Sequence, residues 1–163
     1  MGGRMSAFRK SMIAASFLLA LAGGAYAASD WLKGSTDEQL KTLAAIQPGL
    51  GTVMIEYANR YSDIFYAAKG GNWPLAAYQL KEMREIQEVG ETTRPGRADA
   101  LKAFEQSFLD PLQKTIEAKD VQNFETAFKS GIQGCDGCHA ALGFPYIKYE
   151  IPSSPPSPLV MTP

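Results

Sequence analysis

The chain has 163 residues, of which 45% are hydrophobic, 10% aromatic and 20% charged, and its formal net charge is −1 at pH 7. This composition is too apolar for a disordered chain and too charged for a bundle of membrane helices. The length indicates one folded domain. Because 16 basic residues are balanced by 17 acidic ones, the chain has no overall positive field, and we expect no nucleic-acid partner.

Residues 1–27 have the features of a cleavable signal peptide. Three basic residues precede an apolar run over 12–21, and Ala25 and Ala27 offer the small side chains that a signal peptidase accepts. The run is shorter than the roughly 20 residues that a membrane-spanning helix needs. We therefore expect export to a bacterial periplasm and no membrane span after cleavage, with an uncleaved anchor as the alternative. The mature chain would keep 13 basic and 17 acidic residues, a net charge of −4.

The next elements predicted are a short helix and then four longer amphipathic helices. In the lead segment 28–49, Ser35 and Glu38 have the spacing of a capping box, and Pro48 ends the short helix. Over residues 50–143, apolar side chains recur every three or four positions in four stretches. These stretches are 50–68, 73–86, 101–116 with a kink at Pro111, and 121–142, whose apolar face starts at Val121. Gly90 to Gly96 is expected to break the second stretch.

No stretch shows the alternation of a strand, so the sequence predicts an all-α fold. Four amphipathic helices with short connections form an antiparallel four-helix bundle. Residues 144–163 contain six prolines, which forbid a helix and predict an extended or disordered tail. The apolar side chains that could hold this tail on the bundle are Phe144, Tyr146, Ile147 and Tyr149.

The two cysteines and the single histidine of the chain fall within five residues, at Cys135, Cys138 and His139. This C-x-x-C-H sequence is typical of covalent haem attachment. Cysteines three apart on a helix project to one side and can reach the two vinyl groups of one porphyrin. The adjacent imidazole is then placed to bind the iron from the proximal face. The sequence therefore predicts one covalently bound haem c.

Other uses of these residues are less well supported. A structural zinc site needs four nitrogen or sulfur ligands, and only three are present. A thioredoxin-like pair expects a βαβ context, and a disulfide fits poorly within a helix. Gly131, Gly134 and Gly137 each weaken the same helix by about 1 kcal/mol relative to alanine. They would let a porphyrin edge or a neighbouring helix approach closely, unless they mark only a frayed helix end.

With its signal peptide, four helices and late C-x-x-C-H, the chain resembles the class II c-type cytochromes, the cytochrome c′ and cytochrome c556 family. The resemblance covers roughly residues 50–142. It implies that Cys135 and Cys138 form the thioethers and that His139 is the proximal iron ligand. The family's distal residue lies early in the first bundle helix, and Met54 matches that position. The short helix before Pro48 and the proline-rich tail depart from the family pattern.

The distal side of the haem is where the sequence leaves alternatives open. Met54 is either a sulfur ligand or an ordinary core side chain, and a second histidine ligand is excluded within one chain. Tyr57 and Tyr61 follow on the same helix face. They either hydrogen-bond a distal ligand or form an aromatic wall of the haem pocket.

Two functions follow from the two states of the distal site. With Met54 bound, the protein would carry electrons between periplasmic redox proteins, and its negative charge would favour partners with positive docking patches. With an open iron, it would bind NO or CO as cytochrome c′ does. A haem subunit of a larger redox complex, docked through the tail, is a further alternative. Family analogy implies a homodimer. We expect no enzymatic activity, because no second histidine is available as a distal base.

Overall fold

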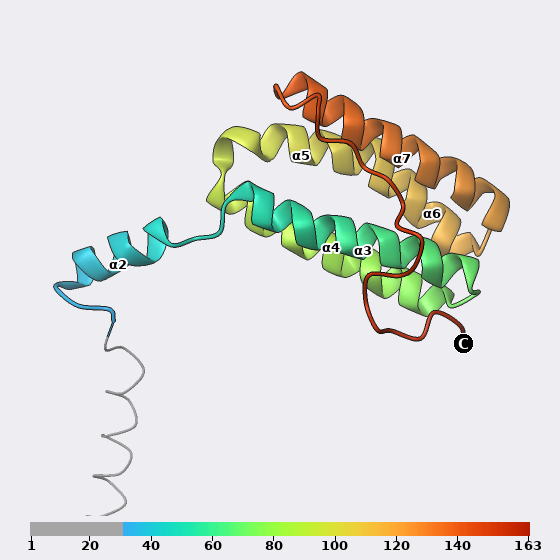
Figure 1. Ribbon diagram of the computed structural model, residues 1–163, viewed down its shortest axis with the longest axis horizontal. Coiled ribbons are helices and arrows are strands. Elements are labelled where there is room, and N and C mark those ends of the chain that lie inside the picture. Colours follow the sequence, from blue (N-terminus) through green and yellow to red (C-terminus); the bar gives the residue numbers. More distant parts are fainter. Residues whose placement is uncertain (1–30) are drawn as a thin grey trace, which may run out of the picture. The chain divides into compact units, whose positions relative to one another are not determined.

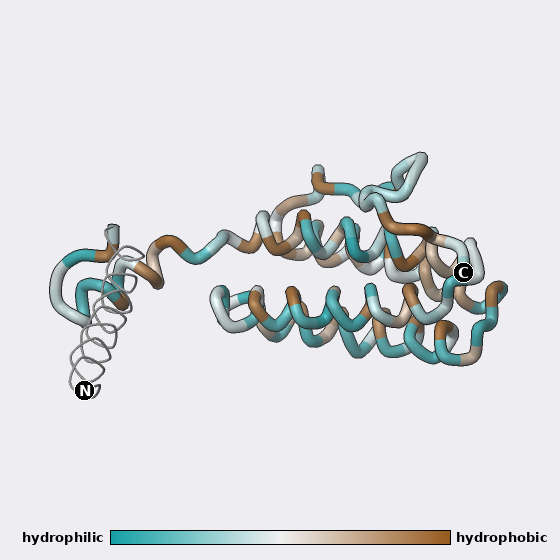
Figure 2. Tube along the Cα trace, turned by 90° about the horizontal axis from the view of Figure 1, so that it is seen from below, coloured by the Kyte–Doolittle hydropathy of each residue, from teal (hydrophilic) through white to brown (hydrophobic). Residues whose placement is uncertain are grey.

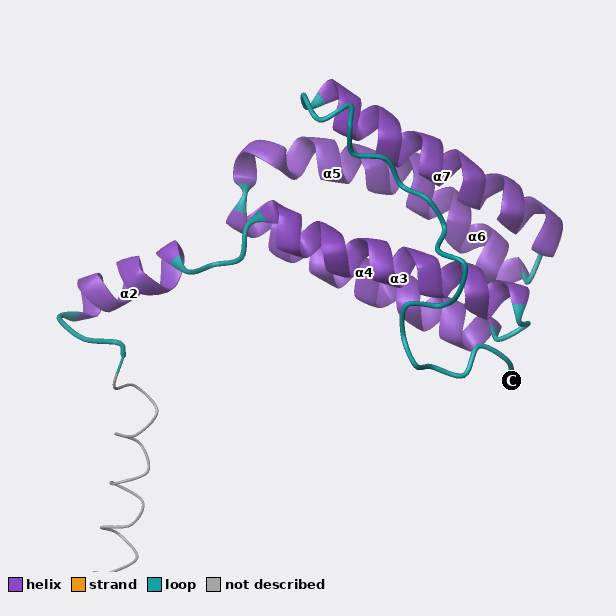
Figure 3. Ribbon diagram, viewed as in Figure 1, coloured by secondary structure: helices purple, strands orange, loops and turns teal. Residues whose placement is uncertain are grey.

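The computed structural model describes residues 31–163, and the predicted signal peptide lies outside them. Every regular element in this described part is helical, so the predicted all-α class is confirmed (Figure 3). Teal and brown residues alternate along each long helix in Figure 2, which is the pattern of amphipathic helices. The chain divides between Gln47 and Pro48 into two compact units.

The first unit contributes one described helix, α2, over Thr36–Ala45. Its start is the predicted capping box. The Ser35 hydroxyl accepts from the Glu38 backbone N–H at 3.4 Å, while the Glu38 carboxylate accepts from the Ser35 backbone N–H at 2.7 Å. Both otherwise unpaired groups at this helix end are thereby satisfied.

The second unit begins with two long helices, α3 over Leu50–Lys69 and α4 over Trp73–Thr93. Asn72 caps α4 by accepting from the Leu75 backbone N–H at 3.2 Å. Helix α4 continues past Gly90 and ends at Thr93, within the break expected at Gly90 to Gly96. Gly90 is buried there because the side chains of Leu50, Val53 and Leu101 close over it.

The third predicted helix is one helical run whose hydrogen-bond pattern changes in the middle. A short 3-10 turn, η1, over Pro95–Arg97 leads into α5 over Ala98–Phe104, the π-helix η2 over Glu105–Leu109, and α6 over Asp110–Ala118. Pro111 lies in the first turn of α6 and supplies no N–H. The expected interruption thus takes the form of a π-turn before the proline. Lys119, with φ 54°, ends α6.

The last helix, α7, spans Val121–Ala141. Asp120 caps it by accepting from the Asn123 backbone N–H at 3.1 Å. Val121 is 47% exposed, in contrast to its expected place on the apolar face, because it occupies the first turn. Phe124 and Phe128 are fully buried and set which face of α7 points inward.

Packing between these helices closes on itself within the second unit. Helix α3 packs on α4, and α4 contacts α5 and α6. Helix α7 contacts α5, η2 and α6 on one side and α3 on the other (Figure 1). The interior is aliphatic and aromatic. Its fully buried side chains include Tyr61, Ile64, Met83, Leu109, Leu112, Phe124 and Phe128.

Residues 144–163 form neither helix nor strand. Gly143, with φ 91°, reverses the chain after α7, and the segment then crosses α7 and α3 (Figure 1). Three of the four residues expected to hold this tail on the bundle are exposed, because they lie in or next to the reversing turn: Phe144, Tyr146 and Ile147. The tail residues that do pack against the core are Tyr149, Ile151 and Met161.

Candidate functional site

The C-x-x-C-H residues occupy the last two turns of α7. Cys135, Cys138 and His139 are each half-buried, and both cysteines are free thiols. The side chains of Phe124 and Phe128, earlier on the same helix, are anchored in the core. Their burial fixes the rotation of α7 and turns the three motif side chains toward the inside of the second unit.

All three motif side chains line one small cavity of about 70 Å³. Helix α3 supplies the opposite wall, which includes Met54 at half-buried exposure. Every candidate site residue of the sequence therefore contacts the same space. The full lining consists of Met54, Tyr57, Ala58, Tyr61, Leu101, Phe104, Cys135, Cys138, His139 and Tyr149.

Burial keeps the motif thiols in their neutral form. Loss of hydration raises the pKa of Cys135 to about 12, with a smaller contribution from the neighbouring Asp136 carboxylate. Burial raises the pKa of Cys138 as well, although Arg97 opposes it. A neutral thiol is a poor nucleophile toward disulfides and a poor metal ligand. The environment therefore disfavours thiolate chemistry at this motif.

The imidazole of His139 is oriented by the tail. Its Nδ1 lies 3.3 Å from the carbonyl oxygen of Ile147. When Nδ1 donates its hydrogen to this carbonyl, Nε2 keeps a free lone pair. A backbone carbonyl on the other ring nitrogen is a common way to fix a metal-binding histidine.

Tyr57 and Tyr61 both line the cavity, and both hydroxyls have partners inside the protein. Tyr57 donates to Gln87 Oε1 at 3.0 Å, and Tyr61 donates to the carbonyl of Phe128 at 2.8 Å. Burial raises the pKa of each phenol, so both stay protonated. Their rings form an aromatic wall, and their hydroxyl hydrogens are already used in these bonds.

A polar network continues from Tyr57 to the surface. The fully buried Gln87 donates through Nε2 to Glu91 and to Glu105, at 2.9 Å each. Arg84 in turn donates to Glu105 on the π-helix and to Asp110 at 2.9 Å. The network ties α4 to η2 and α6 behind the cavity wall, which fixes the place of Tyr57.

Two of the three glycines near the motif make room for aromatic side chains. A Cβ at Gly131 would lie 2.0 Å from the Tyr61 hydroxyl oxygen, and a Cβ at Gly134 would lie 2.5 Å from a ring carbon of Phe108. Gly137 has no neighbour within 4 Å of a Cβ. Close approach of a neighbouring helix thus accounts for Gly131 and Gly134.

Four residues complete the cavity wall and were not among the candidate site residues: Ala58, Leu101, Phe104 and Tyr149. Leu101 and Phe104 are three apart on the third predicted helix, so their shared face was visible in the sequence. Tyr149 was expected to hold the tail on the bundle, and it does pack against the core. Its place at the cavity had no sequence signal, because the path of a proline-rich segment is set by its tertiary contacts. Its ring meets Tyr61 edge-on at 5.5 Å, and its hydroxyl lies 2.7 Å from Ser62 Oγ.

These residues fit haem in their chemistry. Two thiols, an imidazole nitrogen and a thioether sulfur face one space whose walls are otherwise apolar and aromatic. The volume of this space is well below the roughly 300–1,000 Å³ of pockets that enclose drug-sized ligands. The cavity would therefore have to widen to take a haem. Tyr57, Tyr61, Leu101 and Phe104 are the buried part of the wall, whereas the other lining residues, Met54 and Tyr149 among them, are half-buried.

Comparisons of the chain with models of known protein families, with curated proteins and with solved structures give no match. None of the helices over residues 31–163 is both long enough and apolar enough to cross a membrane.

Proposed function

We propose that this chain is an exported monohaem c-type cytochrome that carries electrons. Its fold would be an antiparallel four-helix bundle built from α3, α4, the run α5–η2–α6, and α7. The observation that carries the proposal is the common cavity, which Cys135, Cys138 and His139 line from α7 and Met54 lines from α3. A plain packing motif would not need two neutral thiols, an imidazole and a thioether around one space.

In this proposal the motif residues hold one haem c. The thiols of Cys135 and Cys138 would add to the two vinyl groups to give the thioether bonds, and Nε2 of His139 would be the proximal ligand. The haem supplies a one-electron iron couple when it is bound. Leu101, Phe104 and the rings of Tyr57 and Tyr61 exclude water from it.

Met54 is proposed as the distal ligand. It lies on the first turn and a half of α3, on the face that lines the cavity. Met54 and His139 together would hold the haem iron and leave it no open site for a substrate, and the group would then supply one-electron transfer. Met83, by contrast, is fully buried in the core and does not line the cavity.

The proposed location is the periplasm, and the proposed partners are redox proteins. Residues 1–27 would direct export, and cleavage would leave a net charge of −4. Docking patches of positive charge on the partner would complement this charge and speed encounter.

The visible spectrum of the exported, matured protein tests the distal ligand, with Met54→Leu and Met83→Leu as a matched pair. Each variant removes one thioether sulfur and keeps the side-chain volume nearly constant. We expect the wild type and Met83→Leu to be low-spin when reduced and unchanged by CO. Met54→Leu should become high-spin and bind CO. A wild type that is already high-spin and shifts with CO would overturn electron transfer and support the gas-binding alternative.

A further inference from the structure

Residues 147–149 of the C-terminal tail contact the C-x-x-C-H motif. We infer that it is a positioning element of the site: the Ile147 carbonyl sets the ring of His139, and Tyr149 closes the cavity over Cys135. This inference rests on the proposed haem site and goes beyond it, because it gives a segment outside the helices a defined role.

The motif end of the tail is held by three contacts in three consecutive residues. The Ile147 carbonyl lies 3.3 Å from His139 Nδ1, and the Tyr149 backbone N–H donates to Asp136 Oδ1 at 3.0 Å. Lys148 Nζ lies 3.4 Å from the second oxygen of the same carboxylate. Asp136 lies between the two cysteines in the sequence, so these contacts hold the tail directly on the motif.

The side chain of Tyr149 then links α7 to α3. Its ring lines the cavity beside Cys135 and packs edge-on against Tyr61 at 5.5 Å. Its hydroxyl lies 2.7 Å from Ser62 Oγ on α3. Tyr149 is thus the one lining residue that lies outside the helices, and it bridges α7 and α3.

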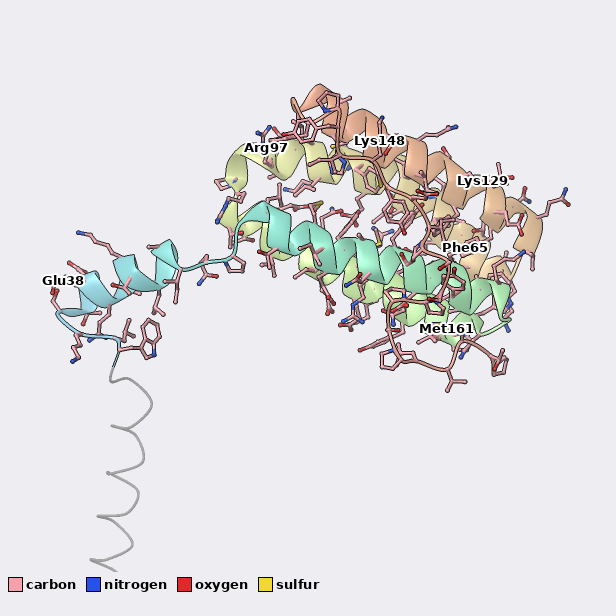
Figure 4. All side chains as sticks on the ribbon, in the orientation of Figure 1. Glu38, Phe65, Arg97, Lys129, Lys148 and Met161 are labelled. Atoms are coloured by element: carbon pink, nitrogen blue, oxygen red, sulfur yellow. The ribbon has the colours of Figure 1, made fainter. Side chains whose placement is uncertain are left out.

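The far end of the tail is held at the turn between α3 and α4, by Gly70 and Asn72. Asn72 Nδ2 donates to the carbonyls of Val160 and Thr162, at 3.3 Å each. A Cβ at Gly70 would lie 2.3 Å from the Met161 carbonyl oxygen, so glycine is what lets the tail lie this close. Lys148 over α7 and Met161 beside α3 mark the two ends of this path in Figure 4. Because the tail is held at both ends, the residues between them keep a fixed position on the helices.

The chemical consequence concerns the histidine. An imidazole in solution exchanges between two neutral tautomers, whereas a carbonyl on Nδ1 selects the form whose Nε2 is free. That is the nitrogen which an iron ligand on this motif must present. The tail therefore prepares the ligand before the cofactor arrives.

The test uses the full-length, haem-free chain and three variants of the tail. Tyr149→Ala removes the ring that closes the cavity, and Tyr149→Phe keeps the ring without the hydroxyl. Tyr146→Ala is the matched control, because Tyr146 belongs to the same tail but is 77% exposed. Far-UV circular dichroism checks that each variant is folded.

Two readouts are measured on each protein. The first is the rate at which a maleimide labels the Cys135 thiol, and the second is the nitrogen NMR spectrum of the imidazole, which needs no assignment because His139 is the only histidine. We expect Tyr149→Ala to raise the labelling rate by about tenfold or more, since the thiol loses its cover. We also expect it to convert a single Nδ1–H tautomer into a mixture. Tyr149→Phe should recover most of the protection.

Labelling of Tyr149→Ala no faster than that of Tyr146→Ala would overturn the inference. So would a wild-type imidazole that is already a tautomer mixture. These measurements need no haem, so a matured protein without haem bands would refute the proposed function by a separate experiment.

Discussion

Gly131→Ala is predicted to destabilise the protein, although alanine favours a helix. The new Cβ would lie 2.0 Å from the Tyr61 hydroxyl oxygen and 3.1 Å from the ring carbon that carries it. Tyr61 cannot move aside easily. It is 1% exposed, its ring stacks on Phe128 with centroids 4.1 Å apart, and its hydroxyl donates to the Phe128 carbonyl at 2.8 Å.

The magnitude follows from three contributions. Losing the buried hydrogen bond costs about 1–3 kcal/mol. Forcing extra volume into a packed core costs about 1–3 kcal/mol. In the opposite direction, the higher helix preference of alanine stabilises the protein by about 1 kcal/mol. When this gain is subtracted from the two costs, the free energy of unfolding should fall by about 1–5 kcal/mol.

Urea unfolding followed by circular dichroism measures this change. Gly137→Ala is the matched control, because it lies on the same helix and its Cβ would meet nothing within 4 Å. It should be neutral or stabilise by up to about 1 kcal/mol. Adding Tyr61→Phe to Gly131→Ala should cost less than the sum of the two single changes, since the clashing oxygen is gone. Equal stability of the two glycine variants would refute the close approach of Tyr61 to α7.

Three further predictions use the same assay. Tyr57→Phe should lower the free energy of unfolding by about 1–3 kcal/mol, because the buried Gln87 Oε1 loses its donor; no change would mean that Gln87 finds another partner. Arg84→Ala should lower the free energy of unfolding by about 2 kcal/mol, because the contacts to Glu105 and Asp110 are lost. The control Lys81→Ala removes an exposed side chain and should change the stability little. Equal effects of the two variants would contradict the network. Hydrogen bonds from Asn123 lower the pKa of Asp120 below its usual value in the folded protein. The Asp120 carboxylate therefore stabilises the fold fully at pH values above the usual pKa, and this stabilisation is lost as the pH falls through the lowered pKa. Asp120→Asn should keep the cap but lose this part of the acid dependence, and an unaltered pH profile would contradict it.

Helix starts were predictable because their chemistry is local. Ser35, Asn72 and Asp120 each accept from a backbone N–H three residues ahead, and those acceptors can be read directly from the sequence. The apolar spacing also placed Met54, Tyr57 and Tyr61 on the inward face of α3, which lines the cavity. Short-range patterns therefore identified most of the wall.

Features that depend on distant contacts could not be predicted. Gly90 remains within α4 because Leu50 and Leu101 pack over it, and this burial outweighs its weak helix preference. The π-turn before Pro111 is one of several ways a helix can accommodate a proline. The place of Tyr149 is set by Ser62 and Asp136, which lie 87 and 13 residues away in the sequence.

The most direct test of the central claim is the mass and visible spectrum of the exported chain after denaturation, measured for the wild type and for single and double alanine variants of Cys135 and Cys138. The proposal predicts that the wild-type chain keeps one haem covalently bound through two thioethers, that each single variant keeps one thioether, and that the double variant releases its haem on denaturation. A wild-type chain that carries no haem, although the maturation machinery is present, would contradict the proposal.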